Sequence, residues 1–258
     1  NPVDLIDGKF YYFNQDEEGQ ESYKKVLNYF KAHDCKIGYQ MFELKNPDVR
    51  TDVFAEDLTD GEKKAILEEC KWNFWFFWIY VMRLQVNVNT LLAIDSMLAD
   101  HNTLEETMRQ SGKSTTTRVY SEWAYLFHKD HYPYICWLNR DAVLSNHMMV
   151  HLKNDSKKLP SYLHGTDHEV ENVIHRVTSI SDLVSYIKDL HDNADMSTDA
   201  RILTIIDDFE LIHDIENTDK LKELLSLPVH IVANSIPNDP KNIPNLMKVF
   251  QKDREVIV

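Results

Sequence analysis

The sequence predicts an α/β fold in which a mostly parallel sheet is flanked by helices and follows an N-terminal helical lobe. Beyond Gln85, short apolar runs of strand length alternate with amphipathic stretches of helical periodicity. Such alternation is typical of a parallel sheet that helices cover on both faces. The preceding residues instead carry long helical patterns and a dense aromatic run, which favour a separate lobe. At 258 residues the chain is long enough for both parts.

The N-terminal lobe is expected over residues 1–84. Helical patterns cover 21–32 and 60–84, and Thr59 precedes the second as a candidate cap before an acidic first turn. The aromatic run Trp72–Met82 is shorter than the roughly 20 apolar residues that span a bilayer, so no membrane partner is expected. We expect its side chains to be buried on almost all sides. An exposed partner surface is the alternative.

The core is expected over residues 85–258. Its expected strands are 103–108, 132–138, 201–207 and 229–234, and its expected helices are 113–127, 141–153, 181–190 and 218–227. The apolar residues of 181–190 recur at the three- and four-residue spacing of a helix that lies on a sheet. The polar stretch 164–172 predicts a surface loop or an irregular strand edge, and 255–258 predicts a further strand.

Charge and cysteine content restrict the kind of protein. With 42 acidic and 28 basic residues, the formal net charge of −14 is the opposite of what a protein that coats nucleic acid needs. Any DNA contact is therefore expected to be local. The three cysteines lie far apart without a C-x-x-C pair, which predicts no disulfide framework or cysteine zinc site and fits a reducing, intracellular setting. The chain begins with Asn1 and has no signal peptide, so we expect it to be a piece of a longer protein.

The segment RQSGKST, residues 109–115, carries the strongest chemical signal. A Gly-Lys-Ser turn between a strand and a helix directs backbone N–H groups and the positive end of the helix dipole at phosphate, although a solvated turn is the alternative for the tripeptide alone. Lys113 is expected to reach the β- and γ-phosphates, Ser114 to ligate Mg²⁺, and Gly112 to let the backbone approach closely. Thr107 stands where the usual pattern has its first glycine. The expected cofactors are ATP and Mg²⁺, and the expected nucleotide-binding residues are Arg109, Gln110, Ser111, Gly112, Lys113, Ser114 and Thr115.

Two adjacent carboxylates follow the apolar run 202–206. Asp207 is expected to hold the metal and Asp208 to polarise the attacking water, at the end of a strand beside the phosphate loop. A strand can also end in aspartate for solubility alone. The two acids therefore indicate a metal site only in combination with the phosphate loop that precedes them in the chain. Together the two segments predict the ASCE or RecA-like form of the P-loop NTPase fold. Glu210 is a further candidate, although a solvated residue after the strand is the favoured interpretation.

A third strand end completes the set of candidates. Asn234 and Ser235 end the apolar run that begins at Val229, and Pro237 closes it. In ATP-driven motors a polar group at this place senses the γ-phosphate. Asn234 and Ser235 are therefore the candidates for coupling, and an ordinary strand end is the alternative.

The combination resembles the ATPase domain of the large terminase subunit of tailed bacteriophages. The matching features are RQSGKS at 109–114, the apolar strand with two acids at 202–208, and the strand with a Ser-x-Pro exit at 229–237. Terminases commonly lack the first P-loop glycine, as this chain does. The segment from Asn73 to Leu92 is similar to the aromatic and asparagine-containing stretch before the P-loop in T4-like and large-genome phages. The resemblance covers roughly residues 72–240.

The resemblance implies an ATP-hydrolysing motor that moves double-stranded DNA into a procapsid. It implies a homo-oligomeric ring docked on the portal protein, a small terminase subunit as partner, and action in the cytoplasm of the host cell. It also implies that Arg109 contacts phosphate or acts as an arginine finger, and that Asp208 takes the place of the family's catalytic glutamate, which is one methylene longer. Terminases normally continue into a nuclease domain, which does not fit before Val258, so no nuclease activity is expected of this chain.

Several assignments stay open. In the family, a polar residue before the P-loop often recognises adenine, and Gln85, Asn87 and Asn89 are the candidates, with Gln85 taken as the nucleotide-binding one. A helicase-like or remodelling P-loop ATPase would carry the same motifs, because they report ATP and not the work done with it. A nucleotide-binding assembly module without turnover would account for Asp208.

Overall fold

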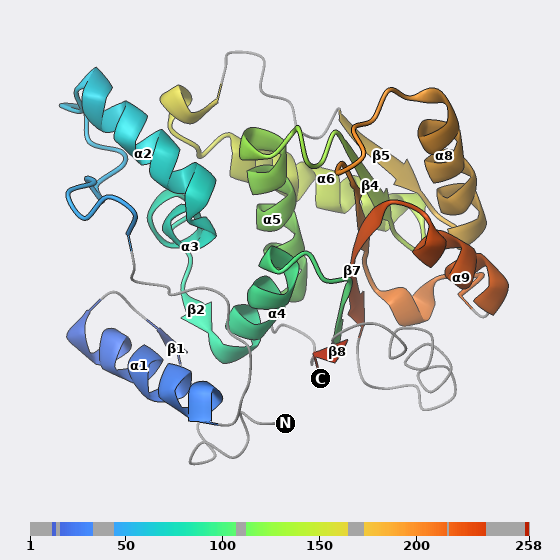
Figure 1. Ribbon diagram of the computed structural model, residues 1–258, viewed down its shortest axis with the longest axis horizontal. Helices are drawn as coiled ribbons and strands as arrows, with labels where there is room; N and C mark the ends of the chain where they lie inside the picture. Colours follow the sequence, from blue (N-terminus) through green and yellow to red (C-terminus); the bar gives the residue numbers. More distant parts are fainter. Residues whose placement is uncertain are drawn as a thin grey trace. The chain divides into compact units, whose positions relative to one another are not determined.

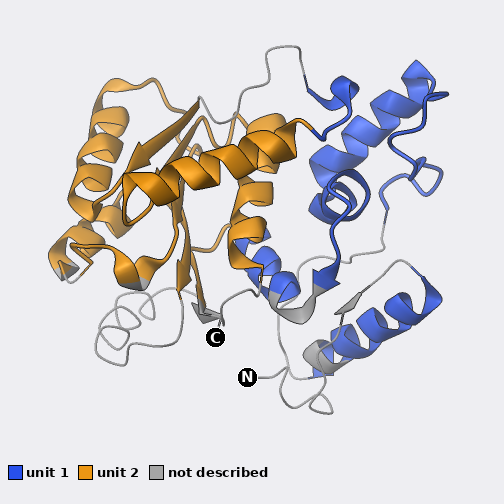
Figure 2. Cartoon of the chain, turned by 180° about the vertical axis from the view of Figure 1, so that it is seen from behind, with its two compact units in different colours: residues 1–99, 158–167 blue, residues 100–157, 168–258 orange. Residues whose placement is uncertain are grey.

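The computed structural model describes residues 12–13, 16–32, 44–106, 112–164, 173–215, 217–235 and 256–257. Its contacts divide the chain into two compact units, residues 1–99 with 158–167 and residues 100–157 with 168–258 (Figure 2). The division falls between Ala99 and Asp100, beyond the change of sequence pattern at residue 85, because helix α4 (Val88–Leu98) packs on strand β2 (Val86–Asn87) of the first unit. Over the described residues, no helix has the length and apolar character needed to cross a membrane.

The first unit is largely helical, as the sequence predicts, and holds one small antiparallel pairing. Strand β1 (Tyr12–Phe13) pairs with β2. The other elements of this unit are α1 (Glu17–Ala32), α2 (Asp60–Trp72), α3 (Phe74–Phe76), η2 (Phe77–Val81), α4 and η3 (Ser161–Leu163).

The continuous helix expected over 60–84 is interrupted at Asn73. The backbone of Asn73 is extended (φ −119°, ψ 96°), and its side chain accepts a hydrogen bond from the N–H of Phe76 at 3.1 Å. This cap starts a second helical segment, which continues as the π-helix η2. Trp72 is 58 % exposed, contrary to the expected burial of the whole run, because the chain turns there and leaves the indole against Lys45, whose Nζ lies 4.3 Å from the ring centroid. The five aromatic residues from Phe74 to Trp78 are buried, as expected.

The second unit is built on a six-stranded parallel sheet with the order β5-β4-β6-β7-β3-β8. The strands are β3 (Thr103–Glu106), β4 (Tyr134–Leu138), β5 (Ile174–Val177), β6 (Ile202–Ile206), β7 (Val229–Ser235) and β8 (Val256–Ile257). All five strand pairings are parallel. Strand β5 was not predicted, whereas the other five lie within or close to the expected ranges.

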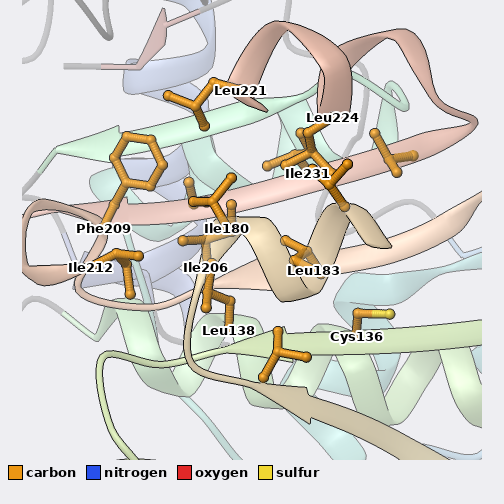
Figure 3. Packing of buried hydrophobic residues seen from close by; sticks show 14 of the residues in the cluster. Cys136, Leu138, Ile180, Leu183, Ile206, Phe209, Ile212, Leu221, Leu224 and Ile231 are labelled. Atoms are coloured by element: carbon orange, nitrogen blue, oxygen red, sulfur yellow. The ribbon is translucent and has the colours of Figure 1, made fainter. Parts of the chain in front are cut away.

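Helices cover both faces of this sheet (Figure 1). Helices α5 (Lys113–Phe127) and α6 (Ala142–Ser156) lie on one face, and α8 (Ile180–Asn193) and α9 (Thr218–Ser226) lie on the other. Beneath α8 and α9, alternate residues of the strands, among them Cys136, Leu138, Ile206 and Ile231, pack with Leu183 and Leu224 in one apolar cluster (Figure 3). Because successive side chains of a strand point to opposite faces, the intervening residues point toward α5 and α6. The predicted α/β fold, with a parallel sheet between two layers of helices, is confirmed.

A buried polar network lies at the amino end of the sheet. His230 is fully buried, and its Nδ1 lies 2.6 Å from the hydroxyl of Tyr132, while its Nε2 lies 2.9 Å from the carbonyl of His101. Asp100 accepts a hydrogen bond from Arg201 at 2.6 Å, and its Oδ1 lies 3.2 Å from the hydroxyl of Tyr132. These contacts give polar partners to the start of β7 and fasten the segments that lead into β3, β4 and β6.

Candidate functional site at the carboxyl end of the sheet

The predicted site residues of the second unit lie at the carboxyl ends of three neighbouring strands. Strand β7 lies between β3 and β6, so the end of β7 and the acids after β6 share one edge of the sheet with the first turn of α5, which contacts Asp207. Clefts at the carboxyl ends of parallel strands are where open α/β sheets bind ligands. Arg109, Gln110 and Ser111 fall outside the described residues, and their predicted roles stay predictions.

The helix α5 begins where the phosphate loop was expected to end. Gly112 precedes the helix with φ 95°, a left-handed conformation that glycine adopts without the strain that a Cβ causes. Lys113 is the first residue of the helix and is buried, with 8 % of its surface exposed. Ser114 and Thr115 follow in the first turn and are half-buried. The positive end of the α5 dipole therefore lies at this edge.

Asp207 is the centre of the site. Its Oδ1 accepts a hydrogen bond from Ser114 Oγ at 3.4 Å and another from Asn234 Nδ2 at 3.3 Å. Its own N–H donates to the carbonyl of Leu138 at 3.0 Å, which continues the parallel ladder by one residue and fixes the backbone. Asp207 is predicted to bind the metal. It contacts Ser114, which is also predicted to bind the metal, and Asn234, which is predicted to couple hydrolysis to movement.

The surroundings of the Asp207 carboxyl group disfavour its ionised form. Burial raises its pKa above the ordinary value, and the neighbouring charge of Asp208 raises it further. The hydrogen bonds from Asn234 and Ser114 and the charge of Lys113 oppose this shift without cancelling it. A cation bound at this edge would relieve the cost, because an opposite charge favours the ionised carboxylate.

Asp208 departs from strand geometry directly after Asp207. Its backbone is left-handed (φ 51°, ψ 52°), and its carbonyl accepts from the N–H of Leu211 as the short helix η4 (Phe209–Leu211) begins. Two consecutive strand residues would point to opposite faces, but the left-handed turn ends that alternation. The half-buried Asp208 carboxylate remains close enough to raise the pKa of Asp207.

The end of β7 supplies polar groups in the middle of the site. Asn234 is fully buried, and besides its bond to Asp207 it has a buried Oδ1 with no hydrogen-bond partner among the described residues. Ser235 is 2 % exposed and stands opposite Glu106 in the pairing of β3 and β7. The coupling role of Asn234 and Ser235 remains a prediction. Asn234 is nevertheless hydrogen-bonded to Asp207, the residue predicted to bind the metal.

Two residues of this region were missed in the sequence. Glu105, 1 % exposed, stands opposite Asn234 in the β3–β7 pairing, where the sequence shows only an acid in an apolar strand. Arg118 donates to Asp155 at 2.9 Å and to the carbonyl of Ser114 at 3.5 Å. It thereby fastens the first turn of α5 to the end of α6. Its spacing of four residues from Ser114 is a usable signal, but the partner on α6 is not visible in the sequence.

Gln85, the predicted adenine contact, lies in the first compact unit. Its side chain is exposed, and its carbonyl accepts a hydrogen bond from Trp78 Nε1 at 3.1 Å. The side chains of the other two candidates, Asn87 and Asn89, fall outside the described residues. Adenine recognition therefore stays a prediction.

The donor set suits a hard cation that keeps most of its water. The described residues contain no group of three or more His, Cys, Asp or Glu side chains able to hold a metal. Ser114 and Asp207 nevertheless offer a hydroxyl and a carboxylate 3.4 Å apart. Magnesium is typically held by one or two such protein ligands together with water and substrate phosphates. The residues present fit a Mg²⁺ that arrives with a phosphate ligand.

Comparisons with known proteins give a distant likeness. No known protein family and no curated protein matches the chain. Among solved structures, a hypothetical ATP-dependent RNA helicase from Sulfolobus tokodaii is similar at 17 % identity with a TM-score of 0.42. The match covers 66 % of this chain, and the chain spans about half of that structure, 51 %. No function carries over at this distance.

Proposed function

We propose that this chain is a magnesium-dependent ATP hydrolase. The observation that carries the proposal is the contact of Ser114 Oγ with Asp207 Oδ1 at 3.4 Å, which joins the helix after the phosphate loop to the acid after β6. A hydroxyl and a carboxylate from these two segments are the protein ligands of Mg²⁺ in P-loop enzymes. The buried Lys113 at the start of α5 supplies the positive charge that the terminal phosphates require.

Each residue of the site has a role in this proposal. Gly112 and Lys113 hold the phosphates at the amino end of α5, and Ser114 with Asp207 hold the metal, which when bound neutralises charge that develops on the phosphates. Asp208 polarises the attacking water. Asn234, hydrogen-bonded to Asp207, reports the presence of the terminal phosphate to β7. Arg109, which precedes α5 in the sequence, contacts the phosphates or acts as a finger.

For the work done with ATP, we propose a terminase-type motor that translocates double-stranded DNA. This part rests on the resemblance of RQSGKS, of the two acids and of the aromatic segment before the loop to phage terminases. The proposed partners are double-stranded DNA, the portal protein, a small terminase subunit and further copies of the chain in a ring, acting in the cytoplasm of an infected host cell. The net charge of −14 suits a motor that grips the DNA backbone locally and releases it, since tight general binding would stall it.

The hydrolase is tested by steady-state turnover of ATP in the parent, in Lys113→Ala and in Lys222→Ala. Lys222 is a matched control, because it lies on α9 with 66 % of its side chain exposed. We expect Lys113→Ala to lose all measurable turnover and most nucleotide affinity, and Lys222→Ala to match the parent. Equal turnover in all three proteins would exclude the proposed site.

The terminase-type motor is tested by adding DNA. We expect blunt duplex DNA to stimulate turnover without any strand separation, because a packaging motor moves along an intact duplex. Stimulation only by single strands, or unwinding of a forked duplex, would favour the helicase-like alternative. Nucleotide binding without turnover in either the parent or Asp208→Glu would favour the assembly module.

A further inference from the structure

Several buried polar atoms of the second unit have no hydrogen-bond partner among the described residues, and they gather on one face. They include Trp137 Nε1, Asn139 Oδ1, Ser145 Oγ and Asn234 Oδ1. These four atoms come from the strands β4 and β7, the residue after β4, or the first turns of α6. Leaving such an atom unpaired destabilises the fold, because the atom loses its hydrogen bonds to water. A ligand or ordered water that satisfies them is the ordinary reason for such a concentration.

Asn139 is the member of this set that stands beside the acid of the site. In the pairing of β4 and β6, Leu138 stands opposite Ile206, so the next residues along the two strands, Asn139 and Asp207, are neighbours at the carboxyl edge. Adjacent strands lie about 4.8 Å apart. The N–H of Asn139 donates to the carbonyl of Val177 at 3.2 Å, which continues the ladder with β5 just as Asp207 continues the ladder with β4.

The side chain of Asn139 points to the same face as that of Asp207. Leu138 and Ile206 both point into the apolar cluster beneath α8 (Figure 3). The residue after each therefore points to the opposite face, which α5 and α6 cover. For Asp207 this direction is verified by its contact with Ser114 of α5. Asn139 is 2 % exposed, so its carboxamide lies within the protein on this side and not in bulk solvent.

We propose that Asn139 orients the water that attacks the terminal phosphate, a role that rests on the proposed hydrolase. Its free Oδ1 accepts one hydrogen bond from that water, beside Asp207. A neutral carboxamide directs a lone pair of the water without removing a proton, as glutamine does in other phosphoryl-transfer sites. Asp208 supplies the carboxylate that the amide lacks. Asn139 therefore orients the water and Asp208 accepts its proton, two functions that one glutamate usually performs.

The step balances with the groups already named. The water oxygen forms a bond to the γ-phosphorus, and the bond from that phosphorus to the bridging oxygen breaks, its electron pair leaving with ADP. The proton released by the water passes to the Asp208 carboxylate and from there to solvent. Asn139 gains and loses nothing, and it contributes by holding the water in line with the bond that breaks.

The competing role for Asn139 is purely structural, as the host of a buried water that stabilises the fold. The two roles separate in Asn139→Leu, which keeps the size of the side chain and removes the acceptor, and in Asn139→Asp, which keeps the acceptor. Ser121→Ala is the matched control, because it removes a buried hydroxyl from α5, which covers the same face of the sheet, and that hydroxyl bonds the carbonyl of Thr117 in its own helix.

The experiment measures kcat and KM for ATP, the affinity for a non-hydrolysable ATP analogue with Mg²⁺, and Tm. We expect Asn139→Leu to lower kcat about tenfold to a hundredfold, within the range for losing one positioning contact, while analogue affinity changes less than threefold. Asn139→Asp should recover part of kcat, because its carboxylate oxygen can still accept the hydrogen bond from the water. Ser121→Ala should retain the parental kcat.

A parental kcat in Asn139→Leu, whatever its Tm, would overturn the assignment, and so would a kcat for Asn139→Asp no higher than that of Asn139→Leu. If Asn139→Leu does not fold, Asn139→Ala, which also removes the acceptor, decides: a parental kcat in this variant contradicts the proposal. Lys113→Ala separates the two proposals. If it abolishes turnover while the Asn139 variants behave as the parent, only the role of Asn139 fails, whereas turnover that survives Lys113→Ala removes both.

Discussion

Ser114 Oγ lies 3.4 Å from Asp207 Oδ1 although 93 positions separate the two residues in the chain. The contact exists because β7 is inserted between β3 and β6, which brings the helix that follows β3 over the end of β6. Asn234 of β7 reaches the same carboxylate oxygen at 3.3 Å. Residues from three separate segments therefore meet at one buried carboxylate.

This contact predicts the behaviour of Ser114→Ala. Removing the hydroxyl takes away one of the two protein ligands offered to the metal, so we expect the Mg²⁺ concentration for half-maximal ATP turnover to rise about tenfold or more. Titration of turnover with Mg²⁺ at saturating ATP measures it. Ser185→Ala is the control, since that hydroxyl donates to the carbonyl of Ser181 within α8, on the opposite face of the sheet. An unchanged Mg²⁺ requirement in Ser114→Ala would contradict the metal site.

The raised pKa of Asp207 predicts a stability effect. Because the folded protein binds this proton more tightly than the unfolded chain, the stabilisation is complete below the ordinary pKa of 3.8 and is lost as the pH rises through the folded value. At pH 7 the ionised, buried carboxylate is a cost, so Asp207→Asn should raise Tm by a few degrees without nucleotide and abolish turnover. Thermal melts from pH 7 to pH 4 should show this advantage shrinking as the pH falls. A lower Tm for Asp207→Asn at pH 7 would contradict the argument.

Asp208 combines a strained backbone with a proposed chemical role, and substitution separates them. A left-handed residue other than glycine costs about 1–2 kcal/mol, so Asp208→Gly should be at least as stable as the parent. Its turnover should fall about a hundredfold or more, the scale of losing a general base. Asp208→Glu keeps the carboxylate and extends it, so it should keep turnover while lowering Tm slightly. Full turnover in Asp208→Gly would assign the base to another residue.

Sequence patterns predicted the parts of the fold that depend on local chemistry. The helix over 113–127 was placed at both ends, because glycine precedes it and apolar residues recur along it. Strand β5 was missed, since IHRV alternates weakly and follows a polar stretch. The break at Asn73 was missed because its cap bond to Phe76 competes with an otherwise strong helical pattern. Pairing with β4 decided the first, and a local side-chain cap decided the second.

The sequence predicted which residues belong to the site, but not which of them are in contact. Asp207 and Ser114 each carry a recognisable motif, and their meeting depends on a strand order that the sequence does not encode locally. Asn139 carries no motif. It is distinguished only by burial, by an unpartnered oxygen and by a neighbour on another strand, all of which arise from the folded chain.

The network at the amino end of the sheet predicts an acid sensitivity separate from the site. Burial lowers the pKa of His230 to about 4, against the opposing charge of Asp100, while Arg201 and His131 lower it further. Neutral His230 accepts from Tyr132 and donates to the carbonyl of His101, and burial disfavours its charged form. Because the unfolded chain takes up this proton first, stability is complete above pH 6.5 and is lost as the pH falls toward 4, by about 3 kcal/mol in all.

His230→Gln should flatten this part of the stability profile. Glutamine cannot become charged and can still donate to the carbonyl of His101, so its unfolding free energy should vary less between pH 6.5 and pH 4, although its stability at pH 7 should be lower. Urea unfolding across that range gives the slope directly. His147→Gln on the exposed face of α6 should leave the parental slope unchanged. If His230→Gln retains the full loss of stability over this range, the acid sensitivity belongs to other groups.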